Sequence, residues 1–375
     1  MQACIPATNI RRVLRWSPIA LAMAAFAVAA APAAPSTENT DTNTPSTVAA
    51  QPAFDAARAR RVALQLADLI EDFYVIPSTA NRYAGALRAN VAAGRYDTCK
   101  DDDDLGARVT ADLQSVAVDR HLRLMTEATL KKRMPPPVAG IPSPAIDTAA
   151  PEMPEGIEAM EMIGAKHDIA YLRFHQFSVD PAAADAARRF LVAHANARAV
   201  IIDGRPLRGG GLPPIDAMLP LFFDRTTTLA RMETRVAAVE RYPEDPVPTL
   251  VPNASTPDIE RLDHVIRPDA RETRLRKVPL LYLTSRRTAS AGEHLALALR
   301  STHRGVLIGE TTAGAGHFGG FETVSDGMTA FLPIGQTVDV RTGMGWEATG
   351  IAPDIAVPAD DALRVALTRL GEPKT

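Results

Sequence analysis

The sequence predicts an α/β fold with a small helical domain in front of it. Up to residue 134, apolar side chains recur mainly at helical spacing, and a proline-rich stretch then interrupts the pattern. From residue 156 onwards, apolar runs of strand length alternate with helix-forming segments, which is typical of an α/β core. The 375 residues, 46% hydrophobic and 23% charged, suffice for one large domain and one smaller one.

The N-terminus has the pattern of an export signal. Three arginines within the first 15 residues precede an apolar run that ends in Ala31-Pro-Ala33. We interpret residues 1–33 as a signal peptide, with an uncleaved anchor as the alternative. Because the run is short, no stable membrane span is expected after cleavage. Residues 34–52, rich in Pro, Ser, Thr and Asn, are expected to form a disordered tether. Cleavage leaves Cys99 without a disulfide partner, which fits a bacterial periplasm.

Composition narrows the class of partner. The formal net charge is -3 and no long basic stripe occurs, which argues against nucleic acid and favours a peptide or a small molecule. His303 and His317 lack a metal-ligand pattern such as His-Glu-x-x-His, so we expect no metal and no cofactor. The oligomeric state is left open by the sequence.

Residues 53–134 are predicted to be the helical domain. Its three helices are expected at Asp55–Tyr74, Thr79–Ala93 and Leu105–Val116. Four aspartates, Asp101–Asp104, precede the third helix. Their spacing lacks the alternation of a calcium-binding loop, so we interpret them as a solvated N-cap. His121 follows this helix and precedes a short apolar alternation.

Residues 135–155 are a proline-rich linker, and residues 156–375 are predicted to be the α/β core. The core begins with a strand, a helix and a second strand, at His167–Phe174, Asp180–Ala197 and Ala199–Ile202. A turn ending in Gly209-Gly-Gly211 follows. It lacks the Gly-Lys-Ser/Thr of a phosphate loop, so its glycines are expected to let backbone N–H groups approach a ligand. Residues 225–277 form a Pro-rich, charged excursion whose length suits a lid or an assembly contact.

Ser290 lies at a predicted strand-to-helix corner. The apolar run Val278–Thr284 is followed by a short polar turn and by helix formers up to Ala298. A serine at this position can act as a nucleophile, because free N–H groups and the positive end of the helix dipole stabilise an oxyanion. The alternative is that Thr288 or Ser290 simply caps the helix.

The C-terminal part continues the alternation. The sequence predicts a strand at Gly305–Gly309 and a glycine-rich loop at Gly309–Gly320 that carries His317. Two alternating runs and a final helix follow, at Met328–Ile334, Gln336–Arg341 and Asp360–Leu370.

Several short motifs recur together in one protein family. They are Tyr171-Leu-Arg-Phe174, Ile201-Ile-Asp203-Gly-Arg205 with Gly209-Gly210, Thr288-Ala-Ser290-Ala-Gly-Glu293, Gly309-Glu310-Thr311-Thr312-Ala-Gly314, and Trp346-Glu347 with Gly350-Ile-Ala-Pro353-Asp354. With the helical region that ends in Asp119-Arg-His121-Leu, they resemble the C-terminal processing, or tail-specific, serine proteases. The similar branch is that of the interphotoreceptor retinoid-binding protein and tricorn core proteins. The resemblance spans about residues 55–370. It implies a crotonase-like α/β core, and the short linker implies that no PDZ domain is present.

The resemblance implies a serine peptidase with Ser290 as nucleophile. In the processing-protease branch a lysine is the general base, but Ala315 occupies its position here and no lysine occurs between Ser290 and Lys374. In the tricorn-like branch a histidine and a glutamate do this work, and the matching positions are His121 and Glu347. His121 would take the serine proton, while Glu347 would orient or electrostatically support the site.

The oxyanion hole implied by the resemblance consists of the N–H of Ala291 with that of Gly209 or Gly210. The sequence departs at two positions from the family's loop, Asp-Leu-Arg-x-Asn-x-Gly-Gly. Gly204 stands in place of the Leu that follows the Asp, and Leu207 stands in place of the Asn.

His317 is an alternative base, because its loop would border the same pocket. Glu293 and His294 lie three and four residues after Ser290, along the helix, and are expected to be structural.

The function expected from this resemblance is that of an exported serine peptidase that acts on peptides or unfolded proteins through an acyl-enzyme. A non-catalytic binder of apolar ligands or peptide tails is the alternative, since one fold serves several functions. An esterase that uses the same serine is a third hypothesis.

Overall fold

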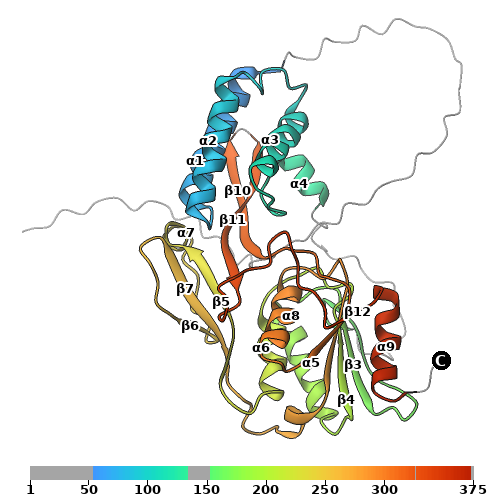
Figure 1. Ribbon diagram of the computed structural model, residues 1–375. Coiled ribbons are helices and arrows are strands. Elements are labelled where there is room, and N and C mark those ends of the chain that lie inside the picture. Colours follow the sequence, from blue (N-terminus) through green and yellow to red (C-terminus); the bar gives the residue numbers. More distant parts are fainter. Residues whose placement is uncertain (1–53, 134–152, 326, 373–375) are drawn as a thin grey trace, which may run out of the picture.

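The computed structural model describes residues 54–133, 153–325 and 327–372. The predicted signal peptide, the tether and most of the linker lie outside these residues. Figure 1 shows a helical region at one end, a parallel sheet with its helices at the other, and a long antiparallel ribbon that reaches from one to the other. Among the described residues, no helix combines the length and the apolar character needed to cross a membrane.

The helical region contains the three predicted helices, α1 (Ala56–Phe73), α2 (Pro77–Ala92) and α3 (Asp102–Val116). Their apolar stripes meet in one core that includes the fully buried Leu66, Tyr83 and Leu113. The N-cap interpretation of the aspartates is confirmed at Asp101, whose carboxylate accepts the N–H of Asp104 at 2.8 Å. A short strand, β1 (Arg123–Thr126), and a helix, α4 (Glu127–Arg133), follow.

The α/β layer is a six-stranded sheet in the order β12-β9-β8-β4-β3-β2, in which only β2 is antiparallel to its neighbour. Its strands are β2 (Ile157–Ile163), β3 (Ile169–Phe174), β4 (Ala199–Asp203), β8 (Leu280–Thr284), β9 (Val306–Gly309) and β12 (Ile355–Ala356). Residues of β3, β4 and β8 alternate between two apolar clusters. One cluster contains α5 (Pro181–Ala193), α6 (Pro213–Met218) and α8 (Ala291–Ser301), and the other contains α9 (Ala362–Arg369). The predicted α/β fold is therefore confirmed.

Short 3-10 helices complete this layer. They are η1 (Leu219–Leu221), η2 (Arg274–Lys277) and η3 (Ala359–Asp361).

A second, antiparallel sheet has the order β1-β11-β5-β7-β6. β10 lies off this path and pairs with residues 328–336 of β11. Its remaining strands are β5 (Thr227–Arg235), β6 (Leu250–Pro252), β7 (Ile259–Ile266), β10 (His317–Ser325) and β11 (Met328–Val338). A short helix, α7 (Val236–Arg241), connects two of them. The excursion at residues 225–277 therefore contributes three strands to a sheet.

Two sequence-based expectations for residues 309–341 were wrong. The loop expected up to Gly320 gives way to β10 at His317, and the two alternating runs form the single strand β11. Gly319 suggested a loop, yet it stands at a register shift where a Cβ atom would lie 2.0 Å from the carbonyl oxygen of Leu332. The glycine permits a close approach of two strands rather than a turn.

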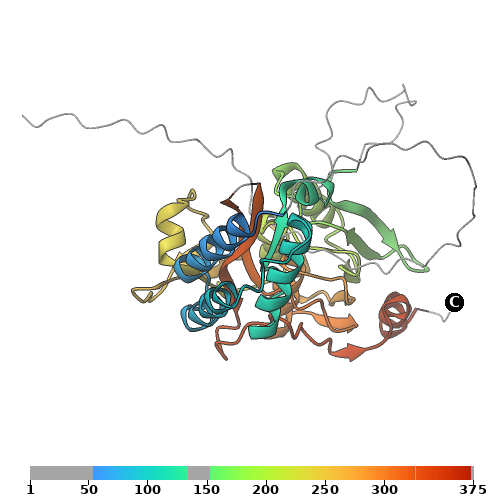
Figure 2. The ribbon, with the colours of Figure 1, turned by 90° about the horizontal axis from the view of Figure 1, so that it is seen from above.

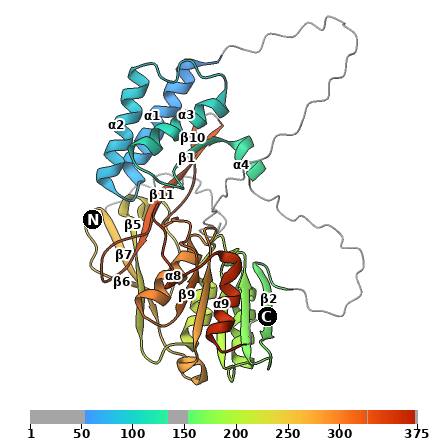
Figure 3. The same cartoon turned by 45° about the vertical axis from the view of Figure 1, so that its right-hand side comes forward.

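The ribbon of β10 and β11 belongs to the C-terminal half of the chain but packs under the N-terminal helices. Val324, Met328 and Leu332 lie in the same apolar cluster as α1, α2 and α3. Figure 2, seen from above, shows the helices lying over this ribbon, and Figure 3 shows the ribbon rising from the α/β layer to them. Because β1 pairs with β11, the turn that carries His121 is brought against the C-terminal half.

Candidate functional site

Ser290 stands between the buried strand β8 and the first turn of α8. Its φ of 59° and ψ of -119° match the first central position of a type II′ turn, which glycine normally occupies. A non-glycine residue there carries roughly 1–3 kcal/mol of strain, and such strained strand-to-helix turns present nucleophilic hydroxyls in other hydrolases. The Oγ is buried and has no hydrogen-bond partner. Ser290 thus occupies the N-cap position, as both interpretations require, while its hydroxyl remains uncommitted.

Glu293 fixes this corner to a neighbouring loop. Its Oε2 accepts the N–H groups of Ser290 and Ala315, both at 2.8 Å, and its Oε1 accepts from Gly314 N at 2.7 Å and Thr312 Oγ1 at 2.6 Å. The side chain is fully buried. Burial raises the pKa of Glu293, although these donors oppose the effect. The carboxylate therefore has a positional role, as the sequence suggested.

Three buried backbone N–H groups near Ser290 have no hydrogen-bond acceptor among the described residues. In the part of the chain that the structure describes, the N–H groups of Gly209, Gly210 and Ala291 donate no hydrogen bond. Gly209 and Gly210 have φ values of 120° and 127°, and a Cβ on Gly210 would lie 2.0 Å from the carbonyl oxygen of Phe177. Both positions therefore need glycine.

The same loop is fastened to the Ser290 turn. The carbonyl of Leu207 accepts the N–H of Ala289 at 3.0 Å, and that of Gly204 accepts Thr288 Oγ1 at 2.7 Å. Position 204 needs glycine for a steric reason, because a Cβ atom there would lie 2.3 Å from the hydroxyl oxygen of Tyr282. The two departures from the family loop thus belong to a locally consistent packing.

His121 lies in the turn between α3 and β1. Its backbone N–H donates to Asp119 Oδ1 at 2.8 Å, and its ring packs against Phe331 with 5.3 Å between the ring centres. The ring is 4% exposed, and neither of its nitrogens has a hydrogen-bond partner. Burial lowers its pKa to about 4, against the opposing charge of Asp119. At neutral pH the imidazole is therefore uncharged and able to accept a proton.

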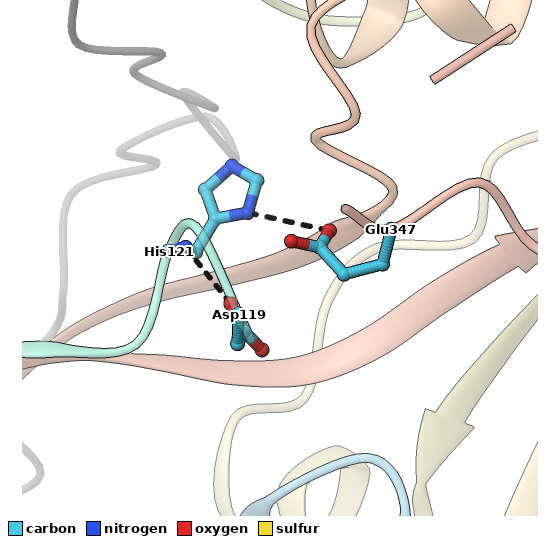
Figure 4. A group of neighbouring side chains, drawn as sticks. All are labelled: Asp119, His121 and Glu347. Carbon is cyan, nitrogen blue, oxygen red and sulfur yellow. Dashed lines mark hydrogen bonds and ion pairs between the residues drawn. The ribbon is translucent and has the colours of Figure 1, made fainter. Parts of the chain in front are cut away.

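Glu347 faces His121 across this turn, as Figure 4 shows. Its Oε2 lies 3.9 Å from His121 Nδ1, which is within ion-pair range but too long for a hydrogen bond. Its Oε1 accepts the N–H of Arg120 at 2.9 Å, while Oε2 accepts those of Gly316 at 2.7 Å and His317 at 3.0 Å. Burial and the charge of Asp119 raise the pKa of Glu347.

His317 lies close to His121 but forms a different pair. Its Nδ1 donates to Asp119 Oδ2 at 2.7 Å, and the hydroxyl of Tyr74 donates to the same oxygen at 2.9 Å. Burial lowers the pKa of His317, but the bond to Asp119 and the charge of Asp119 outweigh it, so the pKa lies above its ordinary value. Burial raises the pKa of Asp119, yet His317 brings it down to about 2. The two residues therefore form a buried ion pair.

Two sets of hydrogen bonds, made by Glu293 and Glu347, hold successive parts of one loop between Ser290 and the histidines. Glu293 binds Ser290 and residues 312–315, and Glu347 binds residues 316–317 and the turn before His121. The structure therefore places Ser290, His121, Glu347 and His317 around one loop, with Gly209, Gly210 and Ala291 at the nucleophile end.

Asp119, His121 and Glu347 each offer one ligand atom within 4.8 Å of the others, a spacing that a metal ion could use. The carboxylates are already engaged, because Asp119 accepts four hydrogen bonds and Glu347 accepts three. A cation would have to displace these donors, so the hydrogen bonding fits a proton-accepting site better than a metal centre.

Sequence reasoning missed Asp119 and Tyr74. Asp119 is fully buried and holds the backbone of His121 and the ring of His317 at once. Its place in Asp119-Arg-His121 was a usable signal, because an acidic residue two positions before a turn residue often accepts that residue's N–H. Tyr74 ends α1 and gave no such signal.

Comparisons with known proteins place the chain in a family. Residues 168–357 match the family described as peptidase family S41, and residues 33–164 match the N-terminal domain of peptidase S41 in eukaryotic IRBP. Similar solved structures include the photosystem II D1 C-terminal processing protease, at 15% identity and a TM-score of 0.50, with 80% of this chain and 94% of that chain covered. Another is a putative peptidase from Parabacteroides merdae, at 17% identity and a TM-score of 0.43, with 57% of this chain covered.

The match spans 64% of the length of the Parabacteroides merdae protein. At these identities the similarity to the processing protease concerns the fold alone. The first family match covers more than half of the chain and contains Ser290 and Glu347, while His121 lies within the second. The chain therefore belongs to peptidase family S41, a family of serine peptidases.

Proposed function

We propose that the protein is an exported serine peptidase that hydrolyses peptide bonds through an acyl-enzyme on Ser290, with His121 as general base. One observation carries the proposal. A strained serine with an uncommitted Oγ is joined through Glu293, one loop and Glu347 to an uncharged histidine whose ring nitrogens are both free. Family membership supports the reaction class.

In the proposed mechanism, Ser290 Oγ bonds to the substrate carbonyl carbon while its proton passes to His121. The resulting oxyanion accepts hydrogen bonds from the N–H of Ala291 and of Gly209 or Gly210. His121 then gives the proton to the leaving amine as the peptide bond breaks. Water, deprotonated by His121, hydrolyses the ester and frees Ser290. Glu347 supports the imidazolium that forms twice in this cycle.

The substrate class is a peptide or an unfolded protein segment. Recognition of C-terminal tails is not part of the proposal, because residues 54–133, 153–325 and 327–372 contain no PDZ domain. The alternative is non-catalytic binding on the same fold. It is favoured by the complete burial of Ser290, which requires that the contacts over Oγ open before any substrate can react.

A fluorophosphonate probe separates these functions. We expect the intact protein to become labelled at one residue, Ser290, because only an activated serine attacks phosphorus at a useful rate. The labelled residue is identified by mass spectrometry of the digested protein. Ser301→Ala is the matched control, since this serine lies in the same helix and its Oγ contacts only carbonyl oxygens; it should label normally. An intact protein that takes no label and hydrolyses no peptide or ester would leave the binding function.

Export is proposed from the N-terminal sequence. We expect cells that express the full chain to accumulate a shortened protein whose first residue follows Ala33 or a nearby small residue, and to hold it in the periplasmic fraction. N-terminal sequencing of that fraction is the measurement. Replacing the three arginines in the first 15 residues with glutamates should leave the protein unprocessed in the cytoplasm. A full-length periplasmic or membrane-bound product would contradict signal cleavage.

A further inference from the structure

A second cluster of ionisable side chains consists of two buried histidines, His264 and His294, and the partly exposed Asp216. His294 Nε2 lies 2.8 Å from His264 Nδ1, and His264 Nε2 lies 2.7 Å from Asp216 Oδ1. Thr249 Oγ1 donates to the second Asp216 oxygen at 3.0 Å. The two imidazoles are at most 2% exposed. The three residues come from α8, β7 and α6, so the cluster connects the antiparallel sheet to the α/β layer.

The direction of the hydrogen bond to Asp216 follows from donor chemistry. A carboxylate only accepts, so His264 donates its Nε2–H to Asp216. Between His264 Nδ1 and His294 Nε2, the donor depends on the tautomers of the two rings. Burial, together with the nearby His264, holds the pKa of His294 well below its ordinary value, which keeps this ring neutral. The ionisable group next to His294 is therefore His264, and the one next to His264 on its other side is Asp216.

One member of this cluster, His294, lies in the same helical turn as Ser290. The backbone N–H of His294 donates to the carbonyl oxygen of Ser290 at 2.8 Å. The same residue therefore holds Ser290 through its main chain and reaches β7 through its side chain. Glu293 anchors the other side of the Ser290 peptide unit.

We infer that Asp216, His264 and His294 are positioning residues that fix the first turn of α8, and with it Ser290, to the antiparallel sheet. The inference rests on the proposed role of Ser290. Buried polar groups are costly unless every one is paired, and an apolar side chain would pack this site at a lower desolvation cost. A hydrogen-bonded network fixes the orientation of the groups that it joins as well as their distance. A strained turn needs both to be fixed. Through His264, the segment at residues 225–277 thereby helps to fix the position of Ser290.

Amide hydrogen exchange tests this inference without any need for activity. In His264→Leu, which changes β7 and leaves the sequence of α8 intact, we expect exchange at the His294 amide to rise on the order of ten- to a hundredfold. His264→Gln retains a donor and an acceptor and should restore most of the protection. His194→Leu is the matched control, because this half-buried histidine ends α5 and its ring bonds to the carbonyl and packs against the ring of Phe190 in the same helix. Unchanged exchange in a folded His264→Leu protein would overturn the inference.

Kinetics give the second readout. Because a small displacement of a nucleophile slows the chemical step, His264→Leu is expected to lower kcat on the order of tenfold or more while KM stays roughly constant. Asp216→Asn retains an acceptor oxygen and should fall between this variant and the wild type, which keeps the test informative if His264→Leu does not fold. If exchange is faster in His264→Leu than in the wild type, but the wild type hydrolyses no peptide, the positioning inference stands and the proposed peptidase activity is rejected. A changed KM at constant kcat would contradict positioning of Ser290.

Discussion

Replacing Ser290 with alanine is expected to reduce kcat for peptide hydrolysis on the order of 10⁵-fold or more, because no other group in the site can form the acyl-enzyme. The fold should persist, since Ser290 Oγ makes no hydrogen bond that would be lost. Hydrolysis of an unfolded protein substrate, followed by the release of new amino groups, is the measurement. A Ser290→Ala protein with unchanged activity would show that the nucleophile lies elsewhere.

Ser290→Gly provides a control for the strain at this position. Glycine adopts the observed φ of 59° without the steric penalty of a Cβ atom, which costs about 1–2 kcal/mol at positive φ. We expect Ser290→Gly to be as inactive as Ser290→Ala but more stable to heat, by about 1 kcal/mol at the melting temperature. Equal melting temperatures for the two variants would indicate that the turn is unstrained.

The identity of the general base is expected to appear in the pH profile of kcat/KM. A base must be unprotonated in the free enzyme, so activity falls as the pH drops through its pKa. The pKa of His121 is lowered to about 4, whereas that of His317 is raised above its ordinary value. If His121 is the base, the profile stays flat from neutral pH down to about pH 4 and falls below it. If His317 is the base, activity is already falling at neutral pH.

Variants of the two histidines complete this test. We expect His121→Ala to lower kcat by at least about 10³-fold, since it removes the proton acceptor. His317→Ala leaves the buried Asp119 carboxylate without its cation, which is expected to cost about 3–5 kcal/mol of stability. A folded His121→Ala protein that retains the wild-type rate would exclude its role. If the fall in kcat/KM at low pH disappears in His317→Ala, the role of general base is assigned to His317 instead.

The corner that carries Ser290 could be predicted because its signals are local. An apolar run, a small polar turn and helix formers follow one another within about 20 residues, and the structure places a strand, a turn and a helix there. The three N-terminal helices were predictable for the same reason, since their apolar stripes are read at a fixed period.

The parts that could not be predicted depend on contacts between distant residues. β5 and β7 pair with each other, and they join the sheet of β1 through β11, which begins more than 60 residues after β7 ends. The histidine in the expected glycine loop lies on a strand for a similar reason. His264 and Asp216 are separated by 48 residues, so the sequence around each of them gives no sign that their side chains form a hydrogen bond.

The pairing of β1 with β11 also sets the order in which the protein can be assembled during its synthesis. Arg123 faces Phe331 in that pairing, and the backbone next to His121 is held by Glu347. Contacts over such sequence separations form late, because the intervening chain must first exist and then close a large loop. A nascent chain that has already produced the Ser290 helix therefore still lacks a positioned His121, which is the base in the proposed mechanism. The proposed site is complete only once β11 and Glu347 have been made and have met the turn that carries His121.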